Sequence, residues 1–111
     1  ADREAVGQAV HGRLTAEGAR LVLVTPFYWD DLRRLTARDG GPEYRSWTQF
    51  GTLAGAPFDH AVLVASAYPP GAPAAAAELP AGAPPACGPA ERVTAGAAAL
   101  DVARLVDAGC R

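Results

Sequence analysis

The first part of the chain alternates between helical periodicity and an unbroken apolar run. Three apolar residues lie four positions apart on one helical stripe: Val6, Val10 and Leu14. This spacing predicts an amphipathic helix over residues 2–17, with Asp2 as its N-cap and Gly18 as the residue that ends it. Residues 20–25 follow without polar alternation, which is typical of a strand that is covered on both faces.

The next part of the chain predicts a second helix and a second strand. Pro26 suits the first position of a helix and Thr25 suits the cap before it, so a helix is predicted from Pro26 to the glycines at 40 and 41. Another candidate helix begins at Pro42, although residues 48–52 also suit a strand. The apolar residues 60–67 then predict a second strand.

These elements predict a single small α/β domain over residues 1–111, with α+β as the alternative class. The two apolar strands are expected to lie parallel in a βαβ unit, flanked by the N-terminal helix and by a C-terminal helix over residues 94–108. Because two strands make a marginal sheet, a further strand near 92–94 or another chain is expected to complete it. Residues 69–90 are rich in Pro and Ala and predict an extended surface arm.

Charge and hydropathy exclude two classes of partner. The chain has a net charge of −2 and a pI near 5.6, with charges of both signs scattered along it. We therefore expect no nucleic-acid partner. No apolar stretch reaches the roughly 20 residues that span a bilayer, so no membrane insertion is expected. All ten basic residues are Arg, a bias typical of a GC-rich genome such as an actinobacterium's.

The chain has two cysteines, Cys87 and Cys110. As a disulfide they would join the last segment to the loop before it, which favours a secreted or extracytoplasmic protein. The alternative is two unpaired thiols in a cytoplasmic protein.

The aromatic residues are concentrated in the middle of the chain, near the predicted carboxyl ends of the parallel strands. Ligands of α/β sheets bind at this edge, and aromatic walls with a few polar groups suit a small-molecule pocket. The predicted ligand-binding residues are Thr25, Tyr28, Trp29, Asp30, Trp47 and Tyr68. The alternative is that most of these rings fill the core of a chain that is rich in Val and Ala.

No catalytic, metal or cofactor motif is recognisable. Asp59 and His60 are neighbours on a predicted strand and therefore point to opposite faces, while Ser66 lies too far from His60 for a triad. The His and Cys residues lack metal-ligand spacing. No Gly-x-Gly-x-x-Gly follows the first strand, so no cofactor is expected.

The sequence thus favours a non-enzymatic, extracytoplasmic domain for binding, sensing or interaction. Its expected partner is another protein or a second copy of the chain, as a homodimer. The alternative is a small cytoplasmic enzyme or accessory protein that binds an aromatic or acidic small molecule. A third hypothesis is a piece of a larger α/β protein.

Overall fold

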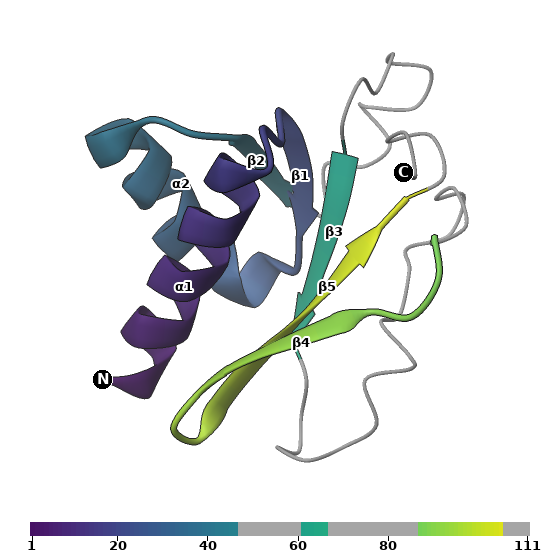
Figure 1. Ribbon diagram of the computed structural model, residues 1–111. Helices are drawn as coiled ribbons and strands as arrows, with labels where there is room; N and C mark the ends of the chain where they lie inside the picture. Colours follow the sequence, from purple (N-terminus) through teal and green to yellow (C-terminus); the bar gives the residue numbers. More distant parts are fainter. Residues whose placement is uncertain (47–60, 67–86, 106–111) are drawn as a thin grey trace.

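The computed structural model describes residues 1–46, 61–66 and 87–105 of the chain. Within these ranges the chain forms a layer of helices against a sheet (Figure 1). The elements in chain order are α1 (Asp2–Ala16), β1 (Leu21–Val24), α2 (Pro26–Asp39), β2 (Glu43–Ser46), β3 (Ala61–Ser66), β4 (Glu91–Ala95) and β5 (Ala98–Arg104).

The sheet has the strand order β2-β1-β3-β5-β4 and is half parallel and half antiparallel. β1 pairs in parallel with both β2 and β3, and its register places Val22 beside Val62. β5 runs antiparallel to β3 and to β4. The mixed α/β class is confirmed, and so is the predicted parallel pairing of the two apolar runs.

Both helices pack on the same face of the sheet (Figure 1). Val22 and Val24 of β1 point toward this face, because alternate residues of a strand share a face. They are fully buried together with the apolar stripe of α1. The stripe consists of Val6, Val10 and Leu14, as the sequence predicts, while α2 contributes Tyr28 and Leu32.

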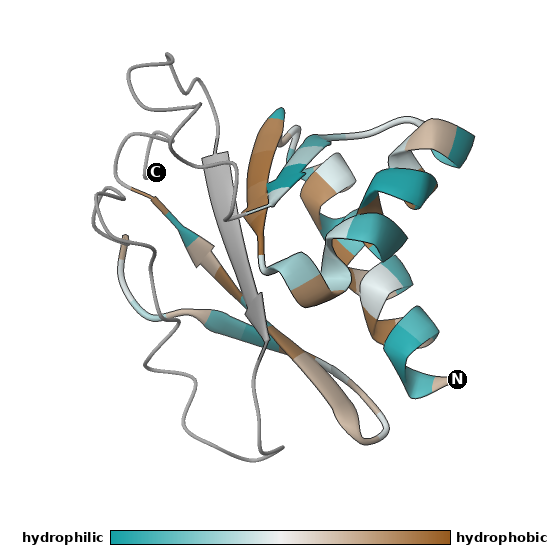
Figure 2. Cartoon of the chain, turned by 180° about the vertical axis from the view of Figure 1, so that it is seen from behind, coloured by the Kyte–Doolittle hydropathy of each residue, from teal (hydrophilic) through white to brown (hydrophobic). Residues whose placement is uncertain are grey.

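The opposite face of the sheet is also buried at its centre. Leu23 of β1 and Leu105 are both fully buried. Asp101 of β5 lies on this face at 3% exposure, and Arg92 of β4 donates a hydrogen bond of 2.9 Å from Nε to its carboxylate. β1 is accordingly hydrophobic along its whole length, as Figure 2 shows.

The predicted C-terminal helix over 94–108 is wrong where the structure describes it. Residues 91–95 and 98–104 form β4 and β5, joined by a tight turn in which Gly96 has a φ of 58°. The Ala-rich segment favours a helix by propensity. Pairing with β3 and burial on both faces outweigh that preference, since β5 is buried without alternation over five consecutive residues. A strand near 92–94, which the sequence also raised, is confirmed.

Two smaller predictions are corrected. The segment after Pro42 begins with β2 rather than a helix, because residues 43–46 pair in parallel with β1. Asp2 is not the cap of α1, which is Ala1. Its carboxylate instead accepts a hydrogen bond of 3.0 Å from the amide of Ala97 in the β4–β5 turn. α1 ends at Ala16, and Gly18 supplies the predicted left-handed residue just after it, with a φ of 76°; α2 starts at Pro26 as predicted.

Neither helix in the described ranges is long and apolar enough to cross a membrane.

Candidate functional site

The two helices begin side by side at the carboxyl end of β1. α2 follows β1 directly, and Arg3 in the first turn of α1 reaches across to it. Arg3 donates from Nε to the carboxylate of Asp31 at 2.8 Å, and its guanidinium also donates to the carbonyl of Phe27. These bonds fix the start of α1 against the start of α2.

An aromatic ring is exposed at this end of the helix pair. Phe27 is 63% exposed, and the Cζ atom of Arg3 lies 4.0 Å from the centre of its ring. A guanidinium at this distance from a ring face makes a cation–π contact. Arg3 therefore holds one side of Phe27, and the ring remains accessible to a partner.

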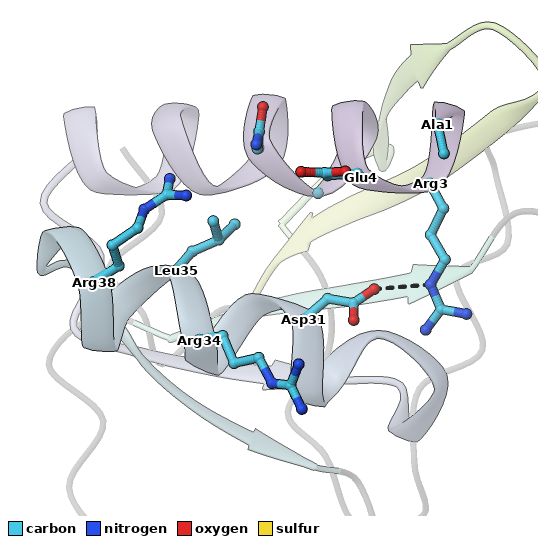
Figure 3. A pocket seen from close by; sticks show the side chains of 9 residues that line it. Ala1, Arg3, Glu4, Asp31, Arg34, Leu35 and Arg38 are labelled. Atoms are coloured by element: carbon cyan, nitrogen blue, oxygen red, sulfur yellow. Dashed lines mark hydrogen bonds and ion pairs between the residues drawn. The ribbon is translucent and has the colours of Figure 1, made fainter.

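A groove runs between α1 and α2 on the outer surface of the helix layer, with the sheet behind it (Figure 3). Its volume is about 390 Å³, which lies near the lower end of the range of roughly 300–1,000 Å³ for small-molecule sites. The ion pair of Arg3 and Asp31 lies at one end of the groove and Arg38 lies toward the other (Figure 3). The cavity is thus sized for a small ligand.

The α1 wall of the groove is built around Gly7. Gly7 lies in the middle of α1 and is buried, yet a Cβ atom placed on it would meet no atom within 4 Å. The missing side chain therefore leaves open space. Glu4 and Gln8, one helical turn apart, also line this wall. Neither side chain makes a hydrogen bond or an ion pair in the part of the chain that the structure describes.

The α2 wall combines an apolar side chain with two cations. Leu35 and Arg38 point up toward α1, whereas the side chain of Arg34 extends away from α1 (Figure 3). Arg34 pairs with Asp30 at 2.9 Å between Nη2 and Oδ2, and Arg38 pairs with its neighbour Asp39 at 2.7 Å. The two arginine side chains are 70% and 62% exposed, so both guanidinium groups are open to solvent.

Electrostatic coupling crosses the groove. The hydrogen bond from Arg38 lowers the pKa of the Asp39 carboxyl below its ordinary value. The same bond raises the pKa of the Arg38 guanidinium, and the charge of Glu4 on α1 adds a smaller contribution in the same direction. The groove therefore has an anion, Glu4, on the α1 wall and a cation, Arg38, on the α2 wall.

A buried polar network fixes the far ends of the two helices. His11 on α1 shares a hydrogen bond of 2.7 Å between Nδ1 and the hydroxyl of Tyr44 on β2, and its Nε2 lies 3.1 Å from the carbonyl of Gly40. Because a carbonyl only accepts, the neutral ring carries its hydrogen on Nε2, and Tyr44 donates to Nδ1. Burial raises the pKa of the Tyr44 hydroxyl, which keeps it protonated as a donor.

The predicted ligand-binding residues are only partly brought together. Thr25 caps α2. Tyr28 is 5% exposed and packs in the core, in line with the alternative that the rings fill the core. Trp29 packs against the core and donates from Nε1 to the carbonyl of Tyr44 at 2.9 Å, and Asp30 pairs with two arginines of α2. Trp47 and Tyr68 lie outside the described residues.

The groove itself escaped the sequence-based prediction. Its residues lie on the outward faces of α1 and α2, where polar side chains are normally just solvated. Gly7 interrupts a helix in which alanine would be more favourable by about 0.5–1 kcal/mol, but Gly12 outside the groove does the same, so this signal alone does not mark the site. A glycine inside a helix often has a packing or functional reason.

Of the two cysteines predicted to form a disulfide, the structure describes only Cys87. The amide of Cys87 donates a hydrogen bond of 2.6 Å to the carbonyl of Arg104 at the end of β5. Cys110 lies outside the described residues, six positions beyond Arg104. The pairing stays a prediction.

Within residues 1–46, 61–66 and 87–105, no three His, Cys, Asp or Glu side chains lie close enough together to hold a metal ion.

No protein-family model, no curated protein and no solved structure matches this chain.

Proposed function

We propose that this chain is a non-enzymatic binding domain whose ligand lies in the groove between α1 and α2. The observation that carries the proposal is Gly7. This residue gives up helix stability and leaves open space in a wall that Glu4 and Gln8 line with free polar groups. Gly12 of the same helix has equal space for a Cβ atom but does not line the groove, so the cavity beside Gly7 is the feature that distinguishes the two glycines.

The arginines of α2 support the same function. Exposed ion pairs such as those of Arg34 and Arg38 contribute little to stability. Their guanidinium groups can therefore turn from Asp30 and Asp39 to a ligand at little cost. Guanidinium groups suit carboxylates and phosphates, which they bind through two parallel hydrogen bonds.

Nuclear magnetic resonance tests the location of the site. We expect that one or more members of a panel of amino acids, organic acids, sugars and nucleosides shift the amide signal of Gly7. Gly12 lies in the same helix, is exposed, and does not line the groove, so its signal serves as the internal control. A panel that leaves the groove signals unchanged in the wild type would count against the proposal.

A matched pair of substitutions separates the groove from the helix. Gly7→Leu fills the open space and is expected to abolish binding, whereas Gly12→Leu makes the same change outside the groove and is expected to preserve it. Both substitutions favour the helix by intrinsic propensity, so loss of binding would not come from unfolding. Equal binding by both variants contradicts the proposed site.

The alternative of a small cytoplasmic enzyme or accessory protein is tested with the same samples. Slow conversion of a bound panel member, seen as new ligand signals that depend on the wild-type protein, favours the enzyme. Unchanged ligand spectra over a day support the binding domain.

A protein partner or a homodimer is part of the proposal, and Phe27 supports it. An exposed aromatic ring held by an arginine is the kind of side chain that anchors protein interfaces. Sedimentation of the wild type and of Phe27→Ser tests this. A dimer that the substitution converts to a monomer supports the interface, whereas a monomeric wild type removes the homodimer.

We also propose an extracytoplasmic location with a disulfide between Cys87 and Cys110. The contact of Cys87 with Arg104 supports it, because Cys110 follows Arg104 closely in the chain. Mass spectrometry of the protein from its native host is expected to find the two cysteines joined, and two free thiols would contradict the proposal.

A further inference from the structure

The groove offers opposite charges and an apolar surface to one small ligand. Glu4 on α1 supplies an anion without an ion-pair partner among the described residues, and Arg34 and Arg38 on α2 supply cations. Leu35 of the α2 wall points toward α1 (Figure 3), and Gly7 lines the cavity on the α1 side. A ligand that satisfies all these groups carries both charges and an apolar part.

We propose that the groove binds a small zwitterion with an apolar body, the chemistry of a free amino acid or dipeptide with an apolar side chain. The inference rests on the proposed function and specifies its ligand. The carboxylate of the zwitterion binds Arg38, its ammonium binds Glu4, and its apolar side chain lies against Leu35 and Gly7.

The charges of the groove favour a zwitterion over a simple acid. An acid alone would meet the arginines but would leave Glu4 facing its own negative charge. An amine alone would meet Glu4 but would lie beside two guanidinium groups. Since Glu4 lines the α1 wall and Arg38 the α2 wall, a ligand that carries both charges can place each charge beside its opposite.

The size of the groove favours a ligand of one or two residues. The lining residues of α2 extend from Asp31 to Arg38, which is about 10 Å at a rise of 1.5 Å per residue. The volume of about 390 Å³ is also small for a site of its kind. A longer peptide would extend beyond both ends.

Three matched probes test the charge requirement: L-phenylalanine, N-acetyl-L-phenylalanine, which lacks the ammonium, and phenethylamine, which lacks the carboxylate. The dipeptide Leu-Phe is added because its charges lie further apart. We expect the amino acid or the dipeptide to shift the Gly7 amide with an affinity at least about tenfold higher than either singly charged probe, since each lost charge removes a charge-assisted hydrogen bond.

Two substitutions assign the charges. Glu4→Gln is expected to bring the affinity for the zwitterion down to that for N-acetyl-L-phenylalanine, and Arg38→Gln is expected to bring it down to that for phenethylamine. Arg33→Gln, on α2 but outside the groove, is the control and should preserve the affinity. All three residues are exposed, so the variants should fold.

The outcomes separate this inference from the proposed function. If N-acetyl-L-phenylalanine shifts the Gly7 amide with the same affinity as L-phenylalanine, the ligand need not be a zwitterion. That result would overturn this inference and leave the proposed binding groove standing. Shifts that depend on protein concentration alone would assign the groove to a second copy of the chain and would also overturn it. Failure of every probe to shift Gly7 would overturn this inference, while failure of the wider panel would overturn the groove itself.

Discussion

His11 and Tyr44, 33 positions apart in the chain, share a buried hydrogen bond of 2.7 Å between Nδ1 and the phenolic oxygen. The bond joins α1 to the edge strand β2 across the core. His11 also contacts the carbonyl of Gly40 at the end of α2, so one imidazole connects three elements. His11 thereby also connects the two helices that form the groove.

Tyr44→Phe is therefore expected to destabilise the protein. The substitution leaves Nδ1 of His11 buried without its donor, which costs about 1–2 kcal/mol of the free energy of unfolding. Urea unfolding measures the change. Tyr28→Phe is the matched control, because Tyr28 is equally buried and its hydroxyl makes no hydrogen bond among the described residues. Equal effects of the two substitutions would contradict the role of the bond.

Gly41→Ala is expected to disturb the same network from the loop side. Gly41 has a φ of 133°, and a Cβ atom there would lie 2.7 Å from Cε1 of His11 and 2.9 Å from Oγ1 of Thr15. We expect a loss of about 2–3 kcal/mol from strain and displaced side chains. Gly18 also has a positive φ, but a Cβ atom there would meet no atom within 4 Å. Gly18→Ala should therefore lower the free energy of unfolding by only about 1 kcal/mol. The reverse order in thermal unfolding would argue against contact with His11.

Glu91 makes stability depend on pH. Hydrogen bonding from Arg13, at 2.5 Å, is the main cause that lowers the pKa of the Glu91 carboxyl below its ordinary value of 4.5. A lowered carboxyl pKa in the folded state stabilises the protein at pH values above 4.5, and this contribution is lost as the pH falls through the lowered pKa.

Glu91→Gln is accordingly expected to reduce stability at pH 7 by about 0.5–1 kcal/mol and to flatten the loss of stability below pH 4.5. Glu43→Gln changes an exposed carboxylate on β2 and should leave both the level and the slope close to those of the wild type. Urea unfolding at a series of pH values measures this, and parallel curves for wild type and Glu91→Gln would refute the prediction.

The proposed disulfide has a measurable effect on stability. If Cys87 and Cys110 are joined, reduction with dithiothreitol should lower the free energy of unfolding by about 3 kcal/mol, as expected for closing a loop of this length. The double variant Cys87→Ser/Cys110→Ser should match the reduced protein and should not respond to the reductant. Identical unfolding of oxidised and reduced wild type would show that no such bond constrains the chain.

The sequence by itself determined α1, β1, the start of α2 and the parallel pairing of β1 with β3, but not β2. Each of these elements formed where a local pattern predicts it. The patterns are the apolar stripe of Val6, Val10 and Leu14, the helix boundaries at Gly18 and Pro26, and the unbroken apolar run of β1. Local periodicity and turn chemistry need no knowledge of distant residues.

Only the tertiary structure decided the rest. Residues 98–104 became β5 because β3 and β4 supply hydrogen-bonding partners and burial on both faces, which no local pattern of Ala, Leu and Val reveals. The groove likewise combines residues far apart in the chain, such as Arg3 and Asp31, which the fold brings into contact. A binding site between two helices is set by how their surfaces approach each other, and that approach is fixed by packing rather than by either helix alone.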